Sequence, residues 1–72
     1  MPTPDQIDDL FTYHAPTPDQ IPHYEAIRAA AKEFAKTLMA HTPQSPDQST
    51  AIRHLRDCVY CANASVALRG QF

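Results

Sequence analysis

The chain has little glycine and cysteine and no tryptophan: of its 72 residues, one is glycine and two are cysteine. A single glycine excludes the glycine-rich loops that hold phosphates in nucleotide-binding folds. Two cysteines cannot build a disulfide framework, and no apolar run approaches the ~18 residues of a membrane span. A chain of this length buries only about 60% of the surface that its unfolded form exposes. We therefore expect one small domain that oligomerises to complete its core, with no room for a deep active site.

Proline, by contrast, is frequent and falls into a repeated motif. Pro-Thr-Pro-Asp-Gln-Ile occurs at residues 2–7 and again at 16–21, and Ser-Pro-Asp-Gln follows at 45–48. Thr or Ser is a good N-cap, Pro suits the first helical position, Asp favours the first turn, and Gln can close a capping box. Each copy therefore predicts the start of a helix.

These start signals predict three helices, over residues 4–11, 18–41 and 46–69. Gly70 is a natural stop for the third. Pro22 lies near the beginning of the second and removes one backbone donor, so we expect a kink or a restart there. No alternating run of β-branched residues predicts a strand.

The two long predicted helices carry apolar residues at steps of three and four, the spacing of a coiled-coil seam. These residues are Tyr24, Ile27, Ala31, Phe34 and Leu38 in one helix, and Ile52, Leu55, Val59, Ala62 and Val66 in the other. The short connection between the helices makes them antiparallel. The sequence thus predicts a single all-α domain over residues 1–72: a short helix and linker over 1–20, and a helical hairpin over 21–72. A two-helix hairpin cannot enclose a core alone, which favours an oligomer.

Charge is divided unevenly along the chain. Residues 1–20 contain Asp but no Lys or Arg, and every basic residue lies between Arg28 and Arg69. Arg28, Lys32 and Lys36 fall on one line along the second helix. A solvated face is the ordinary explanation of such a line, and a phosphate-contacting stripe is the functional one. With a pI of about 6.0, the chain has too few cations for general binding of DNA or RNA.

Catalytic and metal chemistry have little support in the sequence. His54, Cys58 and Cys61 share a helix flank, but a structural zinc site needs four ligands. Unpaired cysteine is more often a small packing residue. No Ser or Asp is placed to work with a histidine, so we expect neither an enzyme nor a cofactor. Tyr13 lies in the linker, where it either packs against the hairpin or offers a stacking platform for a planar base.

Several stretches of the chain, taken in order, are similar to one family. Tyr13 is followed, after Thr-Pro-Asp-Gln-Ile, by Ile27-Arg28, where that family has Tyr and then Ile-Lys. The segments 29–35 and 51–64 and the closing Phe72 fit its later helices. Over residues 11–72 the chain resembles the phage anti-CBASS/anti-Thoeris hairpin-domain proteins, the cyclic-nucleotide sponges.

The resemblance implies a function and a site. Such proteins are phage-encoded homohexamers, trimers of dimers, that act in the cytoplasm of the host bacterium. They bind cyclic nucleotides, cyclic dinucleotides in particular, between protomers without cleaving them. A family tyrosine that stacks on a base corresponds to Tyr13, and a family lysine on phosphate corresponds to Arg28. A trinucleotide site of some members uses an Arg and a Thr where this chain has Ala64 and Ala30. The resemblance therefore does not carry that site over as it stands, and Asn63 is the candidate to replace those side chains.

The sequence prediction for the ligand-binding residues is therefore Tyr13, His14, Arg28, Lys32 and Asn63. No metal ligand, cofactor or membrane contact is predicted. The alternative is a small dimerising regulator, that is, a structural or protein-interaction hairpin with no nucleotide ligand.

Overall fold

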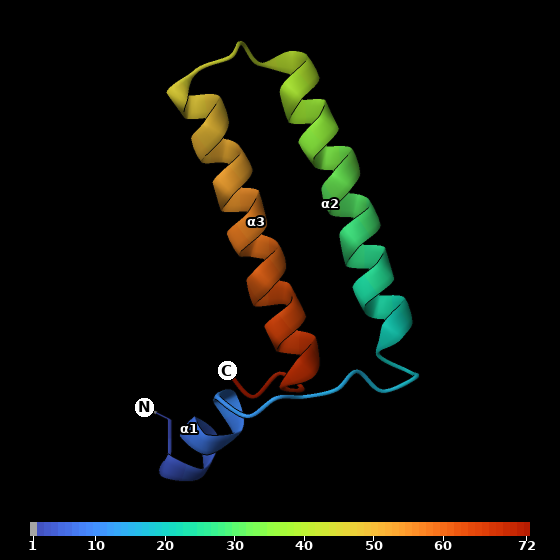
Figure 1. The fold of residues 1–72 in the computed structure, drawn as a ribbon, viewed down its shortest axis with the longest axis vertical. Helices are drawn as coiled ribbons and strands as arrows, with labels where there is room; N and C mark the ends of the chain where they lie inside the picture. Colours follow the sequence, from blue (N-terminus) through green and yellow to red (C-terminus); the bar gives the residue numbers. More distant parts are fainter. Residues whose placement is uncertain (1) are drawn as a thin grey trace.

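Three helices make up the computed structural model, which describes residues 2–72: α1 (Pro4–Leu10), α2 (Ile21–His41) and α3 (Pro46–Ala67). Helices α2 and α3 lie side by side and antiparallel, and α1 sits at the foot of this hairpin, beside the C-terminal tail (Figure 1). Residues 2–72 form no strand, so the all-helical prediction is confirmed. The molecule measures 45 × 29 × 16 Å, and its thin dimension is that of a single layer of helices.

The first copy of the proline motif forms the complete cap that the sequence predicts. The Thr3 hydroxyl accepts from the Gln6 backbone N–H at 3.2 Å, and the Thr3 N–H donates to Gln6 Oε1 at 2.8 Å. This reciprocal pair satisfies two donors that a helix start otherwise leaves free. A helix of only seven residues is marginal without such a cap.

The second copy does not start a helix at Pro18, and this boundary prediction is wrong. The Thr17 hydroxyl donates to Asp19 Oδ1 at 2.6 Å instead of accepting a backbone N–H. Residues 18–20 form turns, and α2 begins at Ile21. The expected kink at Pro22 is not confirmed. Pro22 lies in the first turn of α2. Backbone N–H groups in a first turn have no acceptor within the helix, so the N–H that proline lacks costs no helical hydrogen bond.

The third copy caps α3 with half of the box. The Ser45 hydroxyl accepts from the Gln48 N–H at 3.1 Å. The Gln48 side chain turns instead to the end of α2, where its Nε2 donates to the Thr42 carbonyl at 3.1 Å and to the Thr42 hydroxyl at 3.0 Å. Gln48 is only 8% exposed. This side chain therefore fixes the turn that makes α2 and α3 antiparallel.

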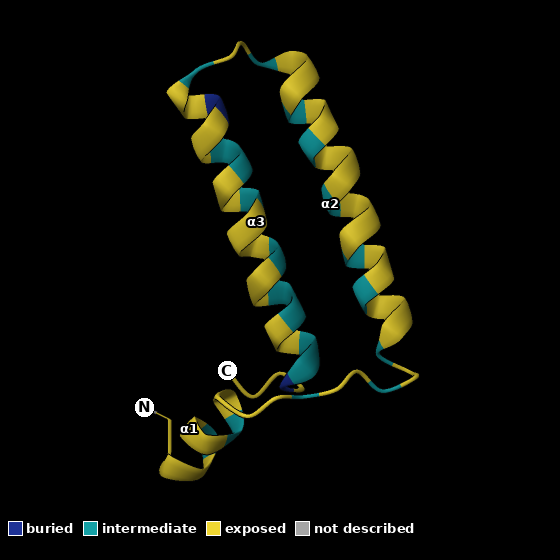
Figure 2. Ribbon diagram, in the orientation of Figure 1, coloured by how far each residue is buried: buried dark blue, intermediate teal, exposed yellow. Residues whose placement is uncertain are grey.

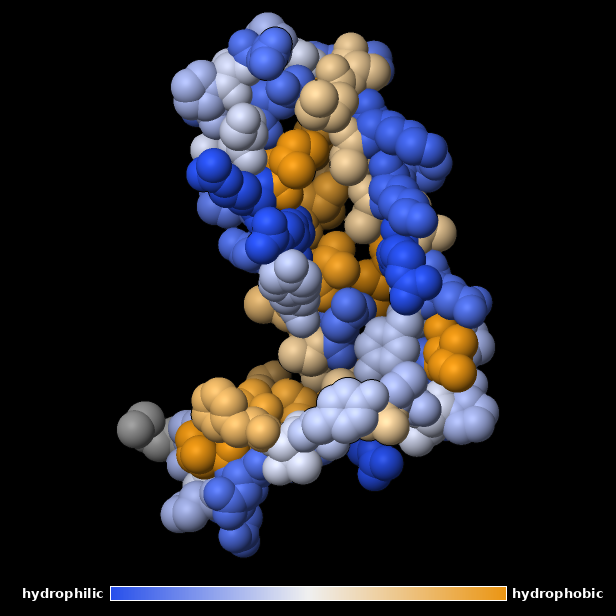
Figure 3. All heavy atoms as spheres, in the orientation of Figure 1, coloured by the Kyte–Doolittle hydropathy of each residue, from blue (hydrophilic) through white to orange (hydrophobic). Residues whose placement is uncertain are grey.

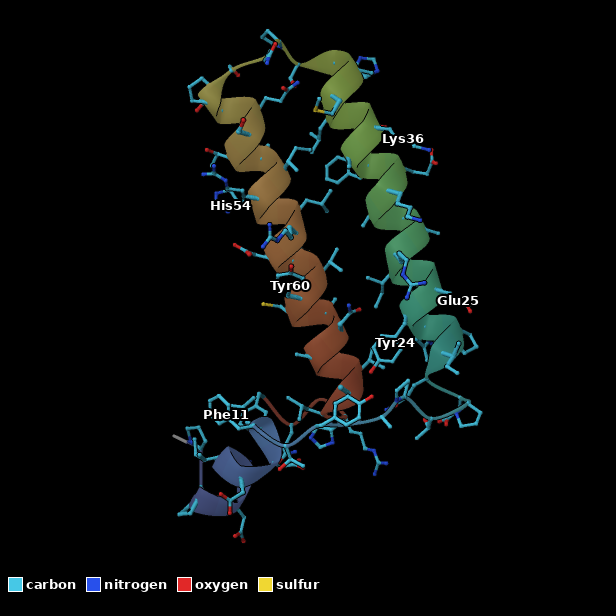
Figure 4. The ribbon with its side chains drawn as sticks, in the orientation of Figure 1. Phe11, Tyr24, Glu25, Lys36, His54 and Tyr60 are labelled. Atoms are coloured by element: carbon cyan, nitrogen blue, oxygen red, sulfur yellow. The ribbon has the colours of Figure 1, made fainter. Side chains whose placement is uncertain are left out.

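The predicted seam is present but shallow. Half-buried residues face each other along both helices (Figure 2), and Tyr24 points from α2 toward α3 (Figure 4). Phe34 departs from the prediction because it is 53% exposed, while the smaller Ala35 is half-buried. Among residues 2–72 only Leu68 and Gln48 are buried, at 7% and 8% exposure. One layer of two helices leaves both of its faces open.

We predict that Gln48→Ala destabilises the hairpin by about 1–2 kcal/mol, because the Thr42 carbonyl loses its side-chain donor in a part-buried position. For a domain of this size that corresponds to a fall in Tm of roughly 4–15 °C, measured by circular dichroism. Gln44→Ala, in the same turn but exposed, is the matched control. Equal melting temperatures for the two variants would contradict the role of Gln48.

Candidate functional site

A hollow of about 550 Å³ lies at the foot of the hairpin, where the linker (residues 11–20) passes the end of α3. This volume lies within the usual range of small-molecule pockets. Its lining comes from α1, the linker, the end of α3 and the C-terminal tail, and most of the lining side chains are polar. The lining residues are Asp9, Tyr13, His14, Ala15, Thr17, Gln20, Ala67, Leu68, Arg69 and Gln71. The site thus joins segments from both ends of the chain.

Gln20 fastens the linker to α3. Its Nε2 donates to the Val66 carbonyl at 3.1 Å, and its Oε1 accepts from the Thr17 N–H at 3.1 Å. Both polar atoms of the Gln20 side-chain amide are therefore hydrogen-bonded, the oxygen to the linker and the nitrogen to α3. The linker is held at the last turn of α3 by this one side chain.

Asp9 connects α1 to the rest of the site. Gln71 Nε2 donates to Asp9 Oδ2 at 2.6 Å, and His14 Nε2 donates to the Asp9 carbonyl at 2.7 Å. His14 Nε2 also lies 3.4 Å from Asp9 Oδ1. Tyr13, next to His14, is 84% exposed. The hydrogen bonds therefore anchor the backbone on either side of a tyrosine ring that faces solvent.

Arg69 occupies a position that normally favours glycine. Helix α3 ends two residues before the predicted Arg69, in a Schellman motif: the Gly70 N–H bonds to the Ser65 carbonyl at 2.9 Å and the Arg69 N–H to the Val66 carbonyl at 3.3 Å. Arg69, with φ 56°, and Gly70, with φ 72°, both lie in the left-handed region, and Arg69 is the one that carries a side chain. Such a conformation costs a non-glycine residue about 1–2 kcal/mol. Strain of this kind is concentrated at functional positions.

The electrostatics of the hollow are mixed. The hydrogen bond from the Thr17 hydroxyl is the largest of the effects that hold the pKa of Asp19 below its usual value. The backbone N–H of Asp19 and the charges of Arg69 and His23 lower this pKa further. Asp19 is therefore ionised near Arg69. No carboxylate among residues 2–72 lies within ion-pair distance of Arg69. Its guanidinium keeps its donors free at the edge of the hollow.

The predicted site residues are divided between three places. Tyr13 and His14 line the hollow, whereas Arg28 and Lys32 are exposed on α2 and are not part of its lining. Asn63 is half-buried on α3, and its Oδ1 has no hydrogen-bond partner. Within one chain, the structure brings together only the two linker residues. Arg69 is the cation that lines the hollow with them. In the sequence it is only the last residue of a predicted helix, and no local motif marks it as a binding residue.

The cysteines stand apart from this site. Cys58 and Cys61 are free and exposed. Within residues 2–72 no group of three or more His, Cys, Asp or Glu is arranged to hold a metal ion. No helix in that range combines the length and apolar character needed to cross a membrane.

Comparison with known proteins gives one match. A family model described as "Acb2/Tad1, hairpin domain" matches residues 3–67 of the chain. No curated protein and no solved structure matches it. The matched region includes α1, the linker and both hairpin helices, and ends just before Leu68 and Arg69.

We predict that Gln20→Ala loosens the linker. Loss of a hydrogen bond worth about 1 kcal/mol should speed hydrogen exchange at the Thr17 amide roughly fivefold, measured by NMR. Gln6→Ala removes the equivalent glutamine of α1 and is the matched control, since it leaves the linker untouched. Unchanged Thr17 exchange in the Gln20 variant would show that the Thr17 amide is protected by a group other than Gln20.

Proposed function

The chain belongs to the family of Acb2/Tad1 hairpin domains, and on that premise we propose that it binds cyclic nucleotide second messengers and withholds them intact from an antiphage defence system. The family is one of anti-CBASS and anti-Thoeris sponge proteins. The observation that supports this function most directly is that Tyr13 and Arg69 both line one hollow. The proposed setting is the cytoplasm of a phage-infected bacterium.

The two side chains offer what a cyclic nucleotide needs. Tyr13 presents an exposed ring from a backbone anchored on both sides, and aromatic stacking accepts any base. Arg69 presents a planar fork of donors that suits a phosphate in two-point contact. The lining residues Asp9 and Gln71 are polar acceptors and donors for a base edge, partly used by their mutual hydrogen bond. The ligand class that fits best is a cyclic dinucleotide.

A cyclic dinucleotide carries two phosphates, and the one arginine in the hollow can contact only one of them. Arg28 and Lys32 are exposed cations outside the hollow, so in this proposal they reach a ligand from a second copy. This is the arrangement between protomers that the family resemblance implies, in a homohexamer built from dimers. Asn63, with its unpartnered oxygen, is a further candidate at such an interface.

Sequestration needs affinity and no transition state. The site fits that requirement, because the His14 Nε2–H is committed to the Asp9 carbonyl and no Ser or Cys lines the hollow. The Thr17 hydroxyl also lines the hollow, and its proton is committed to Asp19 Oδ1 in the turn before α2. We propose binding without cleavage, with no cofactor.

One observation favours the alternative, a protein-interaction hairpin without a ligand. An apolar groove of about 320 Å³ runs along the hairpin and is lined by Ile27, Ala30, Ala31, Phe34, Leu55, Cys58, Val59 and Ala62. Exposed apolar surface of this kind marks contact with another protein. Titration with cyclic nucleotides separates the two functions, because only the sponge responds to them.

We predict that Tyr13→Ala weakens binding of a cyclic dinucleotide roughly 5- to 150-fold, the range expected for loss of about 1–3 kcal/mol of stacking, in isothermal titration calorimetry. Tyr60→Ala, an exposed tyrosine outside the hollow, is the control and should bind like the wild type. Chromatography of the denatured complex should return the ligand uncleaved. Equal affinity for the Tyr13 and Tyr60 variants would remove Tyr13 from the site.

We predict opposite effects of Arg69→Gly on stability and binding. Glycine relieves the left-handed strain at this position, so Tm should rise by roughly 4–8 °C for about 1 kcal/mol. The phosphate contact is lost, so cyclic dinucleotide affinity should fall at least about tenfold, in line with a charge-assisted hydrogen bond of roughly 1.5–3 kcal/mol. A variant that is more stable and binds equally well would show that Arg69 does not contact the ligand.

A further inference from the structure

His14 lines the hollow at the foot of the hairpin with one of its two ring nitrogens already bonded. Its Nε2 lies 2.7 Å from the Asp9 carbonyl oxygen. A carbonyl oxygen only accepts, so the proton of a neutral His14 ring is on Nε2. Nδ1 of the neutral ring is then an acceptor with a lone pair. Within residues 2–72, Nδ1 has no hydrogen-bond partner.

This second nitrogen is the polar atom that His14 has left for a ligand. The two nitrogens of an imidazole point to different sides of the ring, so Nδ1 is directed away from the Asp9 carbonyl that Nε2 meets. The side chain of His14 is only 29% exposed, and the hollow is the space that it borders. Figure 3 shows that the surface along the linker is hydrophilic, whereas hydrophobic side chains gather between α2 and α3 and around α1. The foot of the hairpin is therefore suited to a charged ligand.

The charged groups around His14 come from three segments. On α1, Asp9 Oδ1 lies 3.4 Å from His14 Nε2, so this carboxylate favours a protonated ring. At the end of α3, Arg69 lines the same hollow, and its charge opposes protonation. In the linker, Asp19 lies outside the lining, and the hydrogen bond from the Thr17 hydroxyl is the main cause that keeps its pKa low. A phosphate in the hollow would add a further negative charge that favours the protonated ring.

We propose that His14, in its protonated form, is a second phosphate-binding residue of the hollow, beside Arg69. Protonation leaves the bond from Nε2 to Asp9 in place. It changes Nδ1 from an acceptor, which repels a phosphate oxygen, into a charged donor, which binds one. The inference rests on the proposed function and adds to it: within one chain, His14 supplements the cations proposed to come from a second copy.

The assignment makes ligand binding depend on pH. Arg69 is charged at every pH in the physiological range, whereas histidine ordinarily gains its charge between about pH 8 and pH 5. The hollow therefore presents one cation at high pH and two at low pH. By linkage, a ligand that prefers the protonated ring takes up a proton when it binds, and its affinity falls as the pH rises through the titration of that ring.

Isothermal titration calorimetry with 3′,3′-cyclic GMP–AMP, and in parallel with cyclic di-AMP, tests this assignment. The phosphodiesters and bases of both ligands keep their charge between pH 6 and pH 8, so a change over this range belongs to the protein. The wild type should bind at least about fivefold more tightly at pH 6 than at pH 8, in line with a charge-assisted hydrogen bond. At pH 7, heats measured in two buffers of different ionisation enthalpy should show uptake of roughly half a proton per ligand.

His14→Gln separates phosphate binding from a purely structural role. The glutamine amide nitrogen reaches about as far as Nε2 and can keep the bond to the Asp9 carbonyl, but it carries no charge. This variant should bind like the wild type at pH 8, gain no affinity at pH 6 and take up no proton. His23→Gln removes an exposed histidine outside the lining of the hollow and should keep the pH dependence of the wild type. Circular dichroism at both pH values shows whether each variant is folded.

The contrary outcomes are distinct. Wild-type binding that does not change with pH would overturn the role of His14 and leave the proposed function standing. The same holds for a His14→Gln variant that keeps the pH dependence, or that is weakened equally at both pH values, as expected if His14 only anchors the linker. No binding of either ligand at either pH would contradict the proposed function itself, and this inference with it.

Discussion

The pairing of α2 with α3 is the interaction on which the rest of the structure depends. It is the only contact between helices among residues 2–72, and it forms one layer in a molecule that is 16 Å thin. A single layer buries very little: Leu68 at the foot and Gln48 at the turn are the only buried residues in that range, and neither is completely inaccessible to solvent. Hydrophobic burial therefore aligns the hairpin, and individual polar contacts position the segments around it.

The proposed ligand site is a product of those polar contacts. Gln20 holds the linker on α3, and Asp9 joins α1 both to the linker and to the tail. Arg69 stands beside them in a left-handed conformation that glycine would adopt more easily. A thin hairpin has little stability to spare, so a strained arginine at this position is consistent with a binding role that outweighs its cost.

Local patterns in the sequence predict the helices well and the site poorly. Thr3, Ser45 and the three-and-four spacing identify caps and seam because each depends on residues within about one helical turn. The same motif at Thr17 does not start a helix, since its hydroxyl bonds to Asp19. Phe34, assigned to the seam by its spacing, is exposed, while Ala35 beside it is half-buried. The hollow depends on Gln20–Val66 and Asp9–Gln71, pairs 46 and 62 residues apart. No local pattern encodes such pairs. The sequence therefore does not indicate that Arg69 lies at the same hollow as Tyr13, and the structure does.

The function proposed for this chain is the binding of an intact cyclic nucleotide at the foot of its hairpin. Native mass spectrometry after incubation with a panel of cyclic di- and trinucleotides tests it most directly, because it reads ligand mass, stoichiometry and assembly size together. The expected spectrum shows an assembly of several chains that carries one or more cyclic nucleotides at their full mass. A spectrum with no retained nucleotide from any member of the panel, or with only cleaved linear products, would contradict it.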